Sequence, residues 1–83
     1  MKTIVYTHAA VKQIDTIESK DREAILDALA AYAVSGKGDV KRLSGRPGFR
    51  LRIGRYRVIF NEDAATILAL YAGKRETATY RKN

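Results

Sequence analysis

The sequence lacks cysteine and contains a single histidine, and both features narrow its possible chemistry. Without cysteine the chain has no disulfide, no thiol nucleophile and no thiolate metal site, which is typical of a reducing compartment. His8 has no second histidine and no cluster of carboxylates to complete a metal site, so it is better explained as a structural residue. The residue types therefore indicate no metal centre.

Long hydrophobic runs are also absent. No stretch approaches the roughly 18 apolar residues of a membrane-spanning helix, and the first eight residues have no signal-peptide core. The sequence contains no internal repeat, low-complexity segment or linker. We therefore expect a soluble, cytoplasmic protein without a membrane partner. Its 83 residues suffice for one modest core, so residues 1–83 should form a single domain.

Acidic residues are scarce in the middle of the chain. Sixteen lysines and arginines against nine acids give a net charge of +7. Between Lys37 and Arg57 Asp39 is the only acid, whereas the basic residues there are Lys37, Lys41, Arg42, Arg46, Arg50, Arg52, Arg55 and Arg57. This segregation indicates an anionic partner on one side of the molecule.

The segment 49–60, FRLRIGRYRVIF, alternates apolar and basic residues on either side of Gly54-Arg55. Alternation with period two predicts strands, and a two-residue connection predicts a hairpin. In that register one side is apolar and the other carries Arg50, Arg52 and Arg57, with Arg52 directly opposite Arg57. A cross-strand pair of like charges destabilises a sheet by up to ~1 kcal/mol. Folding alone does not explain such a face, whereas a bound phosphate would.

The remaining pattern completes an α+β fold. It predicts a strand over residues 2–6, a helix over 8–17 capped by Thr7, and a second helix that Ser19 caps and Gly36 ends. Residues 44–48 form a loop, residues 61–63 a turn, and residues 66–72 an apolar strand. The expected order is an N-terminal strand, a two-helix hairpin and a three-stranded antiparallel meander, with the helices on one face of the sheet.

The last strand decides which residues join the basic face. If Leu68 and Leu70 face the helices, then Tyr71 and Arg75 lie on the open side with the three arginines of the hairpin. The alternative for these charged residues is an ordinary solvated strand face, and for Tyr71 it is packing at the rim.

These elements resemble the RelE/ParE superfamily of bacterial toxins from toxin–antitoxin systems, and its RelE branch more closely. The resemblance covers nearly the whole chain and is carried by KRLSG at 41–45, FRLRIG at 49–54, YRVIF at 56–60 and GKR at 73–75, followed by Tyr80. It implies a RelE-like, microbial ribonuclease-type fold. It also implies a ribosome-dependent mRNA endonuclease that cuts the A-site codon by attack of a ribose 2′-oxygen on phosphate, with no metal or cofactor.

The resemblance assigns roles by position. Arg50 and Arg52 occupy basic strand positions where relatives often have lysine, Arg57 would clamp the phosphate, Arg75 would stabilise the leaving group, and Tyr80 would contact the substrate. The expected catalytic residues are therefore Arg50, Arg52, Arg57, Arg75 and Tyr80. The expected substrate-binding residues are Lys41, Arg42, Arg46, Arg55, Tyr71 and Lys74.

One departure keeps a second function open. A guanidinium stays protonated and hardly accepts a proton, so Arg50 and Arg52 are poor general bases. This favours an alternative, a ParE-type toxin that inhibits DNA gyrase without cutting nucleic acid. The family implies an antitoxin partner, docked on the helical hairpin groove or on a sheet edge. It also implies the ribosome and mRNA as partners, and operator DNA only through the antitoxin complex.

Overall fold

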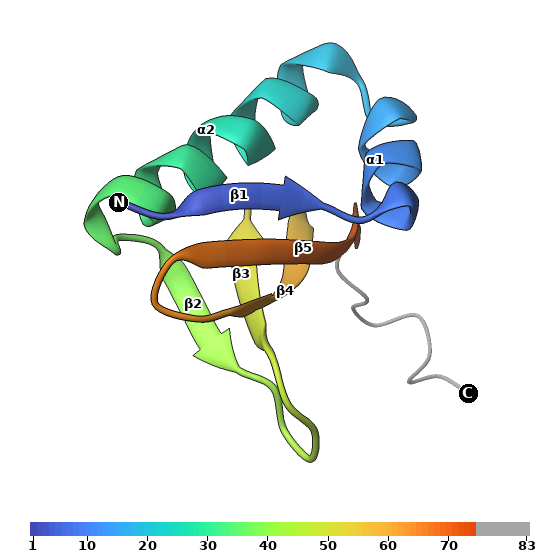
Figure 1. Ribbon diagram of the computed structural model, residues 1–83. Helices are drawn as coiled ribbons and strands as arrows, with labels where there is room; N and C mark the ends of the chain where they lie inside the picture. The colour runs from blue at the N-terminus through green and yellow to red at the C-terminus, as the bar shows by residue number, and fades with distance from the viewer. Residues whose placement is uncertain (75–83) are drawn as a thin grey trace.

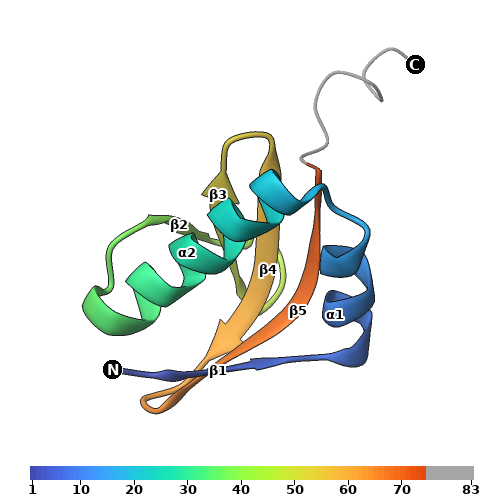
Figure 2. The ribbon, with the colours of Figure 1, turned by 90° about the horizontal axis from the view of Figure 1, so that it is seen from above.

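Five strands form one mixed sheet in the computed structural model, which describes residues 1–74. The order across the sheet is β1-β5-β4-β3-β2. The strands are β1 (Thr3–Tyr6), β2 (Asp39–Arg42), β3 (Phe49–Ile53), β4 (Tyr56–Glu62) and β5 (Thr66–Lys74). β1 runs parallel to β5, and all other neighbours are antiparallel. Both helices lie on the same side of this sheet (Figures 1 and 2), which confirms the predicted α+β class.

The first helix, α1 (His8–Asp15), starts as predicted. The Oγ1 atom of Thr7 accepts a hydrogen bond from the backbone N–H of Ala10 at 3.1 Å, which caps the helix. The helix ends at Asp15, two residues earlier than expected, and Ile17 is buried just beyond its end.

The second helix, α2 (Ser19–Ser35), ends as predicted but begins differently. Glu18 and not Ser19 is the capping residue, and no side chain bonds to the first turn. At the other end Gly36 adopts the left-handed conformation, and its N–H donates to the carbonyl of Tyr32 at 2.8 Å. Within residues 1–74, neither helix has the length and apolar character needed to cross a membrane.

The hydrophobic core fills the space between the helices and the sheet. Its largest fully buried side chains are Ile25, Leu29, Leu51, Val58, Phe60 and Ile67. The two from α2 sit four residues apart, as expected for one helix face. Those from β3 and β4 occupy every second position of their strands, as expected for one face of a sheet. Burying a side chain of this size contributes about 1.5–3 kcal/mol. The opposite side of the sheet has no helix on it among residues 1–74, and we call it the open face.

The hairpin of β3 and β4 has the predicted register. Phe49 pairs with Phe60, Leu51 with Val58 and Ile53 with Tyr56 on the helix side, and Arg52 pairs with Arg57 on the open face.

The sheet contains one more strand than expected. The structure extends the three-stranded meander to four strands by adding β2 at its edge, where Asp39 pairs with Arg52 and Lys41 with Arg50. Only Val40 of this strand packs against the core, so its alternation is too weak to identify it from the sequence.

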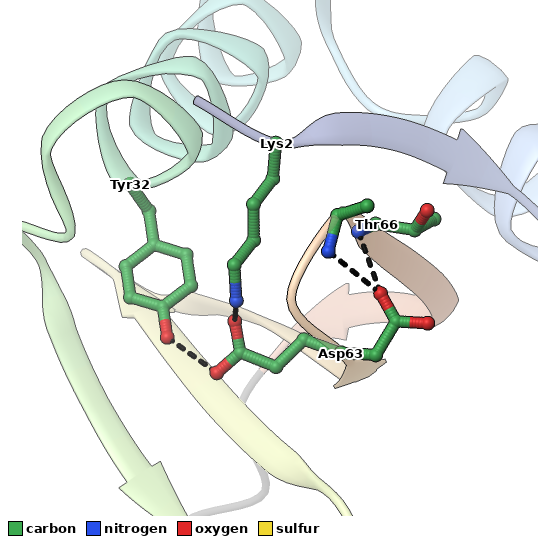
Figure 3. A network of polar contacts seen from close by, with 6 residues as sticks. Lys2, Tyr32, Asp63 and Thr66 are labelled. Carbon is green, nitrogen blue, oxygen red and sulfur yellow. Dashed lines mark hydrogen bonds and ion pairs between the residues drawn. The ribbon is translucent and has the colours of Figure 1, made fainter.

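The predicted turn at residues 61–63 is also shifted, because Asn61 and Glu62 belong to β4. Glu62 is held by the Nζ atom of Lys2 and the hydroxyl of Tyr32, each 2.7 Å from one carboxylate oxygen (Figure 3). The chain turns at Asp63, whose Oδ1 atom accepts the backbone N–H groups of Ala65 and Thr66 at 2.9 and 2.8 Å.

A β-bulge in the last strand changes which residues face the helices. Ile59 pairs with Tyr71 but Phe60 pairs with Ala69, so Leu70 is an extra residue. The buried residues of β5 are Ile67, Ala69 and Ala72. The expectation that Leu68 and Leu70 face the helices is therefore wrong, yet Tyr71 still lies on the open face because the bulge resets the alternation.

Candidate nucleic-acid interface

Two rows of side chains cross the open face over β2, β3, β4 and β5. The registers place Asp39, Arg52, Arg57 and Gly73 in one row, and Lys41, Arg50, Ile59 and Tyr71 in the next. The structure therefore brings the three hairpin arginines together with Lys41 and Tyr71 on one surface. The alternation in the sequence predicts this for the three arginines, whereas Lys41 joins them through β2, which was not expected as a strand.

Arg52 has a partner within the fold. Its Nε atom lies 3.0 Å from Oδ2 of Asp39, in a pair whose side chains are 40% and 48% exposed. Such an exposed pair contributes little to stability, at most about 1 kcal/mol. It does place a negative charge beside Arg52, so the like-charge contact with Arg57 is partly compensated from the other side.

Arg50 and Arg57 differ from Arg52 because no residue within 1–74 accepts a hydrogen bond or forms an ion pair with either guanidinium. The Nε atom of each is buried and unpartnered. A buried donor without a partner carries a cost of about 1–3 kcal/mol. Among residues 1–74 the fold tolerates two such side chains at diagonal positions on adjacent strands, which is the observation most difficult to explain by folding alone.

A hollow of about 420 Å³ lies on the open face beside Arg57. Its lining consists of Leu43, Arg46, Pro47, Arg57, Ile59, Leu70 and Tyr71. The volume falls within the usual range for small-ligand sites. Apolar surface, one aromatic ring and two guanidinium groups suit a nucleotide, whose base is flat and apolar and whose phosphate is anionic.

Three of the predicted substrate-binding residues do not belong to this surface. Arg42 has the opposite parity to Lys41, and its guanidinium lies 5.8 Å from the centre of the Phe49 ring. Arg55 lines a hollow that includes Asp21 of α2, on the helix side. Lys74 pairs with Tyr56 and borders a hollow that includes residues of α1.

Arg75 and Tyr80 lie outside the described residues, so their predicted roles stay predictions. Arg46 does lie beside the hollow, through the loop between β2 and β3. Roles for the residues of the open face also remain predictions from the family resemblance.

Sequence reasoning missed Asp39 and the apolar lining. Asp39 pairs with Arg52 only through β2, a strand that the sequence pattern does not identify. Leu43 and Pro47 lie in or next to a loop, and Leu70 sits at the bulge, so no periodic signal assigns them to the open face. Within the described part of the chain, no cluster of three or more histidine, aspartate or glutamate side chains is suited to hold a metal ion.

Comparison with known proteins gives a clear answer for the fold. No family model and no curated protein matches the sequence. Solved structures do match: a chain of the toxin–antitoxin complex RelBE2 from Mycobacterium tuberculosis has a TM-score of 0.78 at 20% identity, over 89% of this chain and 98% of that one. The protein has the fold of RelE toxins.

Two further RelE structures agree. The archaeal RelE–RelB complex from Pyrococcus horikoshii OT3 gives a TM-score of 0.76 at 23% identity, over 93% of this chain and 98% of that one. The isolated RelE toxin of E. coli gives 0.77 at 16% identity, over 99% and 94%. The resemblance to RelE seen in the sequence motifs is thereby confirmed at the level of the fold.

Proposed function

We propose that this protein is the toxin of a toxin–antitoxin pair and a ribosome-dependent endonuclease that cuts mRNA in the ribosomal A site. The observation that carries the proposal is the guanidinium of Arg57, which is unpaired among residues 1–74 and lies next to Arg52, beside a hollow of nucleotide size. The RelE fold and the net charge of +7 support it. Because its substrate is mRNA, we place its action in the cytoplasm.

The chemistry would be a transfer within the RNA chain. The ribose 2′-oxygen forms a bond to phosphorus while the bond from phosphorus to the 5′-oxygen breaks, which leaves a cyclic phosphate and a 5′-hydroxyl. The 2′-hydroxyl loses its proton to water and the 5′-oxygen gains one from water. Arg57 can bind two phosphate oxygens at once through its planar fork of donors. Arg50 would add a second cation across the neighbouring strand, stabilising the charge that develops on the phosphate.

The test is cleavage by the purified protein on translating ribosomes, with cuts mapped by primer extension. Arg57→Ala should lower the rate by about 30-fold to 1,000-fold, which corresponds to about 2–4 kcal/mol of transition-state stabilisation. Lys20→Ala is the matched control, because it also removes one positive charge but lies exposed on α2, on the helix side. Absence of A-site cuts with the unmodified protein would refute the enzymatic function.

An antitoxin is the proposed protein partner. Solved structures of this fold include RelB–RelE antitoxin–toxin complexes. In the present structure β1 and β2 form the two edges of the sheet, so an extended antitoxin segment could add as a strand at either one. A second segment would lie along the helices. Operator DNA would be contacted only through that complex.

Inhibition of DNA gyrase is the second candidate. It is favoured by one observation, namely that Arg50, Arg52 and Arg57 cannot serve as general bases at neutral pH. A supercoiling assay separates the two functions. Loss of gyrase activity at low protein concentration, together with no RNA product on ribosomes, would establish the ParE-type function instead.

A further inference from the structure

The hydroxyl of Tyr71 lies on the open face next to Gly73 and not at the register position of Tyr71 itself. Tyr71 belongs to the row of Arg50 and Ile59, whereas Gly73, two residues further along β5, is the partner of Arg57. A Cβ atom built on Gly73 would lie 2.7 Å from Oη and 3.1 Å from Cζ of Tyr71. The end of the phenol ring therefore fills the space that a side chain at position 73 would take.

This displacement puts a second hydrogen-bond donor beside Arg57. The space at position 73 is directly opposite Arg57 in the cross-strand pair, where side chains on one face are near neighbours. Tyr71 is 37% exposed and its hydroxyl has no hydrogen-bond partner within residues 1–74. Arg57 is likewise unpaired among these residues. Arg57 and Tyr71 both line the hollow, so two side chains with unused donors border the same space.

We propose that Tyr71 donates its hydroxyl hydrogen bond to the same phosphate group that Arg57 binds, and that Gly73 is the positioning residue that allows it. Regarding the ligand as an RNA phosphate rests on the proposed function. A guanidinium and a phenol supply complementary donors: the guanidinium brings charge and a planar fork, and the phenol brings a single neutral O–H.

Glycine is required here for space and not for backbone conformation. Gly73 is not among the glycines with positive φ, so alanine fits the backbone at this position without strain. Its methyl group would collide only with the end of the Tyr71 side chain, which would have to swing away from Arg57. Gly73→Ala should therefore leave the fold intact and remove the hydroxyl from the site.

The experiment is an NMR titration at low salt with a trinucleotide RNA that carries 2′-O-methyl groups and cannot be cleaved. Tyr71→Phe and Gly73→Ala should each weaken binding by about tenfold, the loss expected for one hydrogen bond to a charged group. In the Tyr71→Phe background, Gly73→Ala should weaken binding by no more than about twofold further, because no hydroxyl remains to be displaced. Tyr6→Phe is the matched control, since Tyr6 packs against the core on the helix side.

Three outcomes would overturn the proposal: unchanged affinity after Tyr71→Phe, a full additional loss from Gly73→Ala in the Tyr71→Phe background, or no binding of the trinucleotide to the unmodified protein. The proposed nuclease function is tested separately, by the cleavage assay on ribosomes. Trinucleotide binding that depends on Tyr71, without A-site cuts on ribosomes, would keep this inference and refute the nuclease. A-site cutting by the unmodified protein, together with unaltered affinity of the Tyr71→Phe variant for the trinucleotide, would support the nuclease and refute this inference.

Discussion

Glu62→Gln tests the contact that joins the N-terminus, α2 and the end of β4. The substitution keeps the size of the side chain and removes its charge. The carboxylate accepts from Lys2 and from Tyr32 at 2.7 Å each (Figure 3), and the Glu62 and Lys2 side chains are only 14% and 28% exposed. Glutamine offers one acceptor oxygen in place of two, so one of these two donors loses its partner.

The expected cost follows from the hydrogen bonds involved. A hydrogen bond to a charged group contributes about 1.5–3 kcal/mol net, and a neutral one about 0.5–1.5 kcal/mol. Losing one bond and weakening the other, at a site that is partly exposed, should lower the free energy of unfolding by about 1–2 kcal/mol. For a domain of this size, each kcal/mol corresponds to about 4–8 °C in Tm. We therefore expect Tm to fall by about 5–15 °C.

The pH dependence of the free energy of unfolding tests the same contact of Glu62 in a second way. Burial alone raises the pKa of Glu62, but the hydrogen bonds from Lys2 and Tyr32 and the charge of Lys2 outweigh it, and the pKa lies below its usual value. A carboxyl whose folded pKa is lowered stabilises the fold above its unfolded pKa, about 4.3. This contribution is lost as the pH falls through the folded pKa. The unmodified protein should lose stability in that acid range, and Glu62→Gln should lose less.

Thermal unfolding followed by circular dichroism between pH 3 and 7 measures both effects. Glu23→Gln is the control, because Glu23 is exposed on α2 and forms no hydrogen bond or ion pair within the described residues. It changes the net charge equally. The reasoning is refuted if the two variants unfold at the same temperature at pH 7, or if Glu62→Gln keeps the full acid dependence of the unmodified protein.

Three further predictions concern other contacts. Asp39→Asn removes the carboxylate that pairs with Arg52, so the salt dependence of single-strand RNA binding should steepen by about 0.7 in log–log slope while Tm hardly changes; an unchanged slope would show that Arg52 takes no part in binding. Gly48→Ala should destabilise by more than about 1 kcal/mol in urea denaturation, because Gly48 has φ 118° and a Cβ there would lie 3.1 Å from Leu43 and 3.4 Å from the carbonyl oxygen of Phe60. Gly45→Ala, which shares the positive φ but has open space around it, should cost less, and equal costs would contradict the contact. Burial and the bonded, negatively charged Glu62 raise the pKa of Tyr32 to about 12, so stability should fall as the pH rises from about 10 to about 12. Tyr32→Phe should make that fall smaller in alkaline unfolding curves, and an unchanged fall would contradict the assignment to Tyr32.

The sequence predicts the centre of the sheet well because two independent signals agree there. Alternation in residues 49–60 fixes which side chains share a face, and the two-residue connection fixes their pairing, so the opposition of Arg52 and Arg57 follows directly. The helices are predicted for a similar reason, with Thr7 and Gly36 marking one end of each.

The sequence is ambiguous where one of these signals is missing. Residues 67–70 of β5 are apolar at every position, so parity alone cannot place the bulge at Leu70, and only packing against the helices selects Ile67 and Ala69 for the core. β2 presents a single apolar residue to the core and is defined by pairing with β3. The end of β4 depends on Lys2, sixty residues away in the sequence, which no local pattern reveals.

The distribution of carboxylates over the open face links the fold to the proposed chemistry. Two adjacent guanidinium groups repel each other, and the fold supplies one carboxylate, from Asp39, to the outer member of the pair. The inner member, Arg57, has no partner among residues 1–74, which leaves it available for the anion of the proposed function, and the Tyr71 hydroxyl lies over Gly73, the residue opposite Arg57. Such a surface is rich in positive charge and hydrogen-bond donors, whereas its arginines have no capacity to accept a proton. In the proposed cleavage, rate acceleration would therefore come from electrostatic stabilisation of the phosphate, with water and not an arginine taking the 2′-hydroxyl proton.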